Sequence, residues 1–170
     1  MNKSQESLLA KFHLRMSQLP NAPQQRLDYV KCETKEDLRN LLALRYSLLE
    51  EEFHEYQLAN CRLQDYITTG VRGCASVDAF KNEIKKLAIE LLDAIVDINV
   101  IATGTAEVLG MYYDDAFEKV MENNLTKCGD DATFREDGKL LKSSSYVPVD
   151  ITGLADEEAF ASHVANVCNT

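Results

Sequence analysis

The most apolar stretch of the chain is Lys86–Ala106, KLAIELLDAIVDINVIATGTA, and it carries three carboxylates. At about 100° per residue on a helix, Glu90, Asp93 and Asp97 fall within an arc of roughly 60°. Anions in an apolar helix are costly unless they are paired, and adjacent carboxylates repel one another. We therefore expect protons or a cation to neutralise them. Mg²⁺, which takes oxygen ligands, is the simplest candidate.

The composition predicts one helical domain. The chain has 170 residues, with only seven Gly and three Pro, which favours helices over a turn-rich β fold. We expect an all-α fold in a single domain over 1–170, with a core over about 12–127 and a C-terminal loop and short helix over 128–170. The net charge of −10 argues against a protein that binds nucleic acid through its phosphate backbone.

The cysteines and the N-terminal segment predict a cytoplasmic protein. Five cysteines are scattered with no CxxC pair, which is typical of free thiols in a reducing compartment. The first residues lack the apolar core of a signal peptide, because Lys11, His13 and Arg15 interrupt it. The run Ile84–Ile101 has the length of a membrane span, but its carboxylates are costly in lipid. We therefore expect no membrane partner.

Apolar residues recur at helical spacing in several parts of the chain. The predicted helices are about Ser4–Leu19, Thr34–Asn60, Val77–Leu109 and Tyr113–Asn123, with a modest terminal helix over Leu154–Asn166. Thr34 fits an N-cap, because acidic residues follow it in the first turn, where the helix dipole favours them. Gly104 is a candidate interruption and Gly110 a helix stop. Residues 66–78 are predicted to connect two helices, and Lys127–Asp150 to form a loop or short hairpin.

A second group of carboxylates lies on the predicted helix Thr34–Asn60. With Leu48 at zero on a helical wheel, Glu52 lies at about 40°, Glu55 at about −20° and Glu51 at about −60°. The three therefore straddle the apolar face. Core-facing positions of a helix are normally apolar, and exceptions to this pattern concentrate at functional sites. The alternative to a functional site is an ordinary acidic helix face in contact with solvent. The second group of acidic residues, in Lys86–Ala106, makes this alternative less favoured.

Two such helices, packed antiparallel, would form an acidic pocket in a bundle core. Oxygen-only ligands favour Mg²⁺ or Mn²⁺ over zinc. These ions clamp phosphate chains and activate water, and a remaining carboxylate acts as the base. A di-iron site would need Glu-x-x-His, and no His follows Glu55 or Glu90 at that spacing. The wheel leaves open which of Glu90, Asp93 and Asp97 would hold metal.

The order of these carboxylates resembles a known signature. Glu51-Glu52-x-x-Glu55 followed by Glu90-x-x-Asp93 is similar to the EExxE…ExxD pattern of the all-α nucleoside triphosphate pyrophosphohydrolases, which include MazG. Flanking segments resemble the phage-type MazG-like branch of that superfamily. They are Phe12–Pro20, Asp93–Gly110, Phe117–Lys127 and Asp137–Ile151, so that the resemblance covers most of the chain.

The resemblance implies a MazG-like helical bundle and Mg²⁺-dependent hydrolysis of a (deoxy)nucleoside triphosphate to the monophosphate and pyrophosphate. dGTP is the first candidate substrate, and phosphoribosyl-ATP is the alternative. The implied metal ligands are Glu51, Glu52, Glu55, Glu90, Asp93 and Asp97, the first three also being catalytic. The implied substrate-binding residues are Asn124, Lys127, Lys139 and Lys142. A phage-encoded protein of this kind would act in the host cytoplasm.

Plainer roles remain open for several of these residues. Asn124 with Lys127 is also typical of a helix C-terminal cap with a solvated lysine, and Lys139 and Lys142 of ordinary loop residues. A non-enzymatic helical module that holds Mg²⁺ or basic partners is the second class of function. The helix over Ile84–Leu109 is apolar nearly all round and needs partners on every side. We therefore expect a homodimer or homotetramer.

Overall fold

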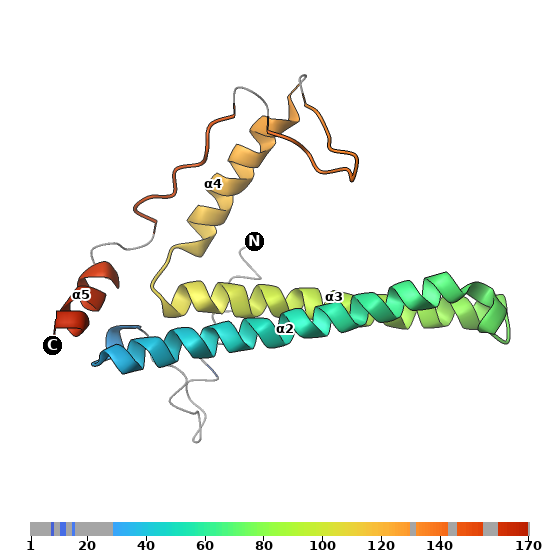
Figure 1. The fold of residues 1–170 in the computed structure, drawn as a ribbon, viewed down its shortest axis with the longest axis horizontal. Coiled ribbons are helices and arrows are strands. Elements are labelled where there is room, and N and C mark those ends of the chain that lie inside the picture. Colours follow the sequence, from blue (N-terminus) through green and yellow to red (C-terminus); the bar gives the residue numbers. More distant parts are fainter. Residues whose placement is uncertain are drawn as a thin grey trace.

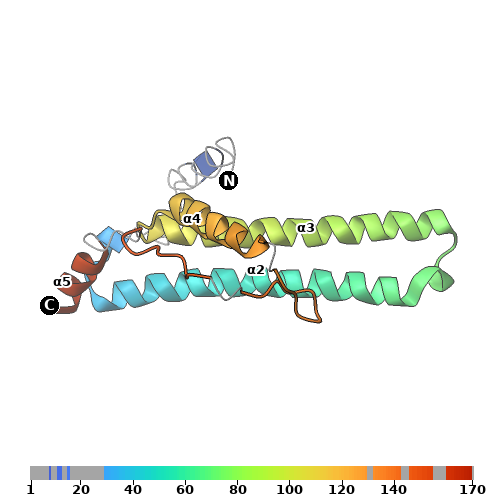
Figure 2. The same ribbon diagram turned by 90° about the horizontal axis from the view of Figure 1, so that it is seen from above.

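Two long antiparallel helices dominate the computed structural model (Figures 1 and 2), which describes residues 8, 11, 12, 15, 29–129, 132–142, 146–154 and 160–169. They are α2 (Lys35–Thr69) and α3 (Val77–Val108), which pack side by side. The other elements are η1 (Tyr29–Lys31), η2 (Gly70–Gly73), α4 (Tyr113–Leu125), η3 (Thr126–Cys128) and α5 (Ser162–Asn169). Over the described residues the fold is helical and holds no β-strand, which confirms the all-α class.

Helix α2 begins at the predicted cap. The Thr34 hydroxyl accepts a hydrogen bond from the Asp37 backbone N–H at 3.1 Å, and the Asp37 carboxylate accepts one from the Thr34 N–H at 2.9 Å. This reciprocal pair is a capping box, and its hydrogen bonds lower the pKa of Asp37. The helix continues past its predicted end at Asn60 as far as Thr69. Stacking of Tyr66 on the Phe80 ring, with centroids 5.2 Å apart, joins this extension to α3.

Helix α3 passes through Gly104 without a break, so the predicted interruption there is wrong. On either side of the glycine, the Thr103 and Thr105 hydroxyls each donate to the carbonyl four residues earlier at 2.7 Å, a bond that a helix interior allows. Gly110 does end the helix, with φ of +67°. A Cβ there would lie 2.6 Å from a ring carbon of Tyr29, so the stop also needs a residue without a side chain.

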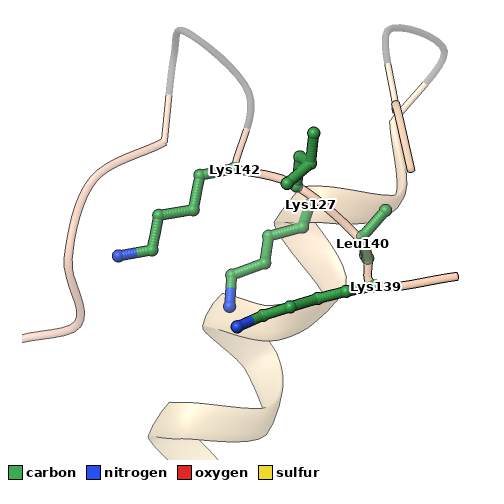
Figure 3. A pocket seen from close by; sticks show the side chains of 5 residues that line it. Lys127, Lys139, Leu140 and Lys142 are labelled. Carbon is green, nitrogen blue, oxygen red and sulfur yellow. The ribbon is translucent and has the colours of Figure 1, made fainter. Parts of the chain in front are cut away.

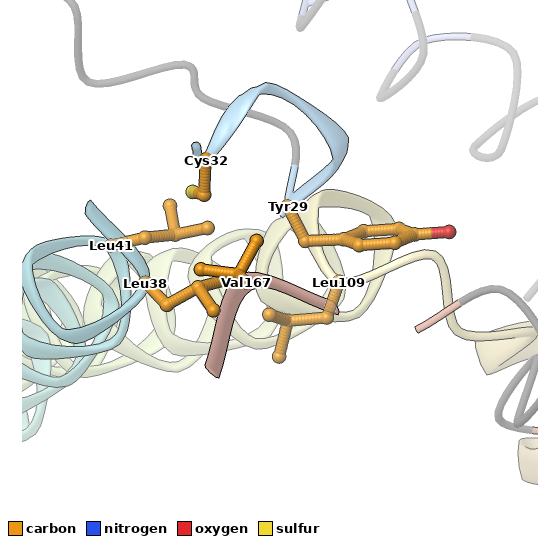
Figure 4. Packing of buried hydrophobic residues seen from close by; sticks show 6 residues of the cluster. All are labelled: Tyr29, Cys32, Leu38, Leu41, Leu109 and Val167. Carbon is orange, nitrogen blue, oxygen red and sulfur yellow. The ribbon is translucent and has the colours of Figure 1, made fainter. Parts of the chain in front are cut away.

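The main hydrophobic core lies at the end of the hairpin where α2 begins and α3 finishes (Figure 4). It joins η1, the two long helices and α5 through Tyr29, Cys32, Leu38, Leu41, Leu109 and Val167. The His163 ring of α5 makes a 2.8 Å hydrogen bond with the Cys32 carbonyl, which ties that short helix to the core. The hairpin beyond this core buries few side chains, mainly Ala59, Leu87 and Ala94.

Helix α4 leaves the end of α3 and points away from the hairpin (Figure 1). The described part of the chain therefore forms a hairpin with one helix apart, which does not confirm the predicted MazG-like bundle. The loop prediction over Lys127–Asp150 is confirmed where the residues are described, with one antiparallel bridge between Phe134 and Leu140.

The terminal helices match the sequence less closely. The predicted helix over Leu154–Asn166 corresponds to α5, which begins later, at Ser162. The one predicted over Ser4–Leu19 lies largely outside the described residues. Among the helices that are described, none combines the length and apolar character that crossing a membrane requires.

Candidate functional site

The contact between α2 and α3 brings two predicted carboxylates together. Glu52 lies half-buried on the side of α2 that faces α3, and Asp97 is half-buried on α3. Partial burial raises the pKa of Glu52, and the nearby charges of Asp97, Glu55 and Glu51 raise it further. The carboxylates of the two helices therefore repel one another across the hairpin.

The other predicted carboxylates are exposed. On α3, the side that packs against α2 carries Leu87 and Ala94, and this turns Glu90 and Asp93 toward solvent. Glu90 lies 3.5 Å from the Arg62 guanidinium of α2, so a cation already faces it. Of the three anions of this helix, Glu90 and Asp93 are therefore exposed and Asp97 is half-buried among the described residues.

No metal-binding group is preassembled in the described part of the chain. Nowhere among these residues do three or more His, Cys, Asp or Glu side chains lie close enough together to hold an ion. The carboxylates in their present positions do not fit a tightly bound metal. The assignment of Mg²⁺ ligands to them stays a prediction.

A separate basic pocket lies where α4 ends and the following loop returns (Figure 3). It has a volume of about 460 Å³ and is lined by Lys127, Lys139, Leu140, Leu141 and Lys142. The three lysines come from two separate segments, η3 and the loop, and their side chains extend into the same space. Three of the predicted substrate-binding residues are thus brought together.

The lysine side chains are held by neighbours. The Lys127 ammonium donates to the side-chain oxygen of Asn124, the fourth predicted residue, one turn earlier on α4. It lies 5.0 Å from the centre of the Tyr146 ring, and the Lys142 ammonium lies 4.6 Å from the same centre. One aromatic face therefore attracts two cations. Tyr146 is the residue that sequence reasoning missed, since its aromatic type alone did not indicate a contact with lysines.

Local turn chemistry positions the third lysine. The Arg135 N–H donates to the Lys139 carbonyl at 2.8 Å and closes a tight turn, in which Gly138 takes a φ of +84°. Arg135 and Asp137 form an ion pair in this turn, and Asp137 also accepts from the Lys139 N–H at 3.2 Å. The Arg135 guanidinium holds the pKa of Asp137 below its ordinary value.

The pocket is suited to an anion. Its five lining residues include three ammonium groups and no carboxylate, although the whole chain carries a net charge of −10. Lysine is a compact, strongly hydrated point charge that binds phosphate groups in many proteins. The geometry therefore permits binding of a phosphate or diphosphate.

A comparison with protein families identifies the chain. A family model described as "UDP-glucoronosyl and UDP-glucosyl transferase" matches residues 11–170. No curated protein matches the sequence. The family match extends over nearly the whole chain, which is a wider span than the acidic motifs cover.

This finding overturns the functional reading of the sequence. The assignments to the MazG-like pyrophosphohydrolases, to hydrolysis of dGTP or another nucleoside triphosphate, and to the hydrolase class are wrong, and the two alternatives do not match either. Acidic residues at helical spacing also occur on ordinary solvated helix faces, so the EExxE…ExxD pattern is not specific enough to assign a family. The chain belongs to the UDP-glucoronosyl and UDP-glucosyl transferase family.

Proposed function

We propose that the protein acts in glycosyl transfer from a UDP-sugar, and that the lysine pocket binds the diphosphate of this donor. Membership of the family supports the reaction class. The observation that carries the site is the convergence of Lys127, Lys139 and Lys142 on one pocket in an otherwise acidic chain. A diphosphate is anionic at neutral pH and complements these three cations.

Two of the lysines are positioned before a ligand arrives. Asn124 and the Tyr146 ring hold Lys127, and the same ring holds Lys142. A side chain that is already ordered loses less conformational entropy when it binds a ligand. Lys139 is carried by the tight turn and lines the pocket from the loop side.

The transfer itself defines what these cations contribute. An acceptor oxygen attacks the anomeric carbon of the sugar, the bond from that carbon to the diphosphate oxygen breaks, and UDP leaves with the electron pair. The acceptor's proton passes to a base. Negative charge grows on the departing diphosphate, and ammonium groups placed around it stabilise that charge in the transition state.

We also propose that Mg²⁺ associates with the carboxylates of α2 and α3. The candidate ligands remain Glu51, Glu52, Glu55, Glu90, Asp93 and Asp97. Mutual repulsion around Glu52 supports the proposal, since a cation relieves it. Mg²⁺ keeps several of its waters in most protein sites and so needs no preassembled cage.

Thermal unfolding at increasing MgCl₂ and constant ionic strength tests this proposal. The melting temperature should rise with MgCl₂, and should rise less in Glu52→Gln. Equal rises in both proteins contradict this.

The diphosphate site is tested by titrating UDP into the protein in a calorimeter. Lys127→Ala should weaken UDP binding by about 10- to 100-fold, which corresponds to one charge-assisted hydrogen bond. Lys85→Ala is the matched control, because it removes the same charge from an exposed lysine of α3 outside the pocket. If the two variants bind UDP equally well, the lysine pocket is not the diphosphate site.

A further inference from the structure

Helix α4 has an apolar stripe that stays exposed in the described part of the chain. Phe117, Met121 and Leu125 are 42%, 44% and 68% exposed. They are four residues apart, which puts them on one side of the helix over a length of roughly 12 Å. Because the helix points away from the hairpin (Figure 1), the two long helices leave these side chains exposed. We call these three residues the α4 stripe.

Two carboxylates border this stripe on one side. Glu118 and Glu122 are exposed, and they lie roughly 60° and 100° around the helix from Met121, the middle of the stripe. Another side of the helix is occupied by the returning chain, since the Asn123 side-chain N–H donates to the Val147 carbonyl at 2.9 Å. The open surface of α4 therefore fits a helix that has an apolar face and a basic edge.

The N-terminal segment of this chain carries a matching apolar pattern. The sequence predicts a helix over Ser4–Leu19, and the backbone is helical at the four residues of this segment that the structure describes. Leu8, Phe12 and Met16 recur at the same intervals of four residues as the α4 stripe, and so cover the same length. The Leu8 side chain is 65% exposed and can therefore accept a partner surface.

The basic residues of the segment match the two carboxylates of α4. Lys11 and Arg15 are exposed, and they are four residues apart, as Glu118 and Glu122 are. Both lie roughly 60–100° around the helix from Phe12, in the opposite rotational sense from the glutamates on α4. When two parallel helices face each other, opposite rotational sides become neighbours. A segment that runs parallel to α4 therefore places its basic edge beside the acidic one.

The connection to the rest of the chain allows this arrangement. Continuous description of the chain begins at Tyr29, whose ring lies beside Gly110, three residues before α4 begins. Residues 20–28 can span about 30 Å, whereas the 13 residues of α4 extend over roughly 20 Å. The segment can thus run along α4 and return from its far end to Tyr29. A tether this short gives an effective concentration of roughly millimolar, so a weak contact is sufficient.

We propose that the segment Ser4–Leu19 docks lengthwise on α4 and parallel to it, with Leu8 at the level of Phe117. Its apolar side chains cover the α4 stripe, and its two basic residues lie beside the two carboxylates. Exposed ion pairs are individually weak, so the apolar contact supplies the affinity and the charges select the orientation. This inference is independent of the proposed transferase activity.

Intramolecular cross-linking through Cys128 tests the contact. This exposed native thiol lies three residues beyond the α4 stripe. In the full chain with Cys61 and Cys168 replaced by Ser, a short bismaleimide should link Cys128 to the thiol of Gln18→Cys, because the parallel arrangement brings the two to nearly the same level. Ser4→Cys is the matched control, since it lies roughly 20 Å farther along the helix. Equal linking of the two variants, or links between separate chains only, overturns the proposal.

Charge reversal in the Gln18→Cys chain tests what orients the segment. Lys11→Glu combined with Arg15→Glu should lower the cross-linked fraction about five-fold or more, which two exposed ion pairs of ordinary strength supply. Lys81→Glu combined with Lys85→Glu is the matched control, because these exposed lysines of α3 have the same spacing. This control should leave the fraction unchanged, and circular dichroism should show an equal helix content in both variants.

A compensating change completes the test. Glu118→Lys combined with Glu122→Lys, added to the reversed segment, should restore the cross-linked fraction to within about two-fold of its original value, because opposite charges then face each other again. Failure of these two changes to restore cross-linking, or an equal loss in the α3 control, overturns the proposed pairing of the segment with α4.

Discussion

The sharpest structural prediction concerns Arg45, which joins the two long helices. Its guanidinium is half-buried between them and donates from Nε to the Thr105 hydroxyl at 3.0 Å and from Nη2 to the Ile101 carbonyl at 2.8 Å. Burial lowers the pKa of this guanidinium, which remains charged at any ordinary pH. We predict that Arg45→Ala separates the helices at this level and destabilises the fold.

The expected size follows from these contacts. Hydrogen bonds to charged groups contribute about 1.5–3 kcal/mol each. Part of this is recovered, because the Thr105 hydroxyl keeps its own 2.7 Å bond to the Ile101 carbonyl and water can enter the space left by the side chain. We therefore expect a loss of about 2–3 kcal/mol in the free energy of unfolding. For a chain of this length, that lowers the melting temperature by roughly 5–10 °C.

Urea and thermal unfolding followed by circular dichroism measure both quantities. Arg39→Ala is the matched control, since that arginine lies on the same helix with its side chain 80% exposed and only a 3.4 Å contact to Glu36. It should cost less than about 0.5 kcal/mol. Arg45→Ala within the same range would refute the view that this arginine holds the hairpin together.

Three further predictions concern stability. Because the fold raises the pKa of Glu52, the folded state binds a proton at this carboxylate more tightly than the unfolded chain does, and the free energy of unfolding falls as pH rises above the unfolded pKa of about 4.3. In urea titrations from pH 4 to 7, Glu52→Gln should reduce this decline. An unchanged decline of the free energy with pH would contradict the prediction. Thr34→Ala should cost about 1 kcal/mol by removing the cap of α2, as measured by urea unfolding; no loss would show that the capping box is dispensable. Gly110→Ala should cost about 1–3 kcal/mol in the same assay, since the new Cβ meets Tyr29 at a positive φ.

Local rules predicted the helices well. The cap at Thr34, the start of α3 and the stop at Gly110 depend on neighbours a few residues away, and each is confirmed. The extension of α2 to Thr69 was missed because it depends on packing of Tyr66 against Phe80, which lies in the other helix. The continuity of α3 at Gly104 was missed because the position is buried, and tertiary packing overrides the low helix propensity of glycine.

The candidate site was harder to predict. The wheels placed Glu52 and Asp97 on acidic faces of their own helices, and the structure brings the two charges near each other. They could not tell that Glu90 and Asp93 face solvent, since an apolar helix looks buried all round until its partners are known. The substrate-binding role of Lys127, Lys139 and Lys142 stays a prediction, although the three lysines do line one pocket. The contact of Tyr146 with two of them depends on how the loop returns.

The central claim is that this chain uses a UDP-sugar. The most direct measurement is release of UDP from UDP-glucose and from UDP-glucuronate by the purified full chain, with a panel of hydroxyl-bearing acceptors and with deoxynucleoside triphosphates as parallel substrates. We predict that UDP is released, and that Lys127→Ala reduces its release whereas Lys85→Ala does not. No release of UDP, together with formation of pyrophosphate from a nucleoside triphosphate, would contradict the account.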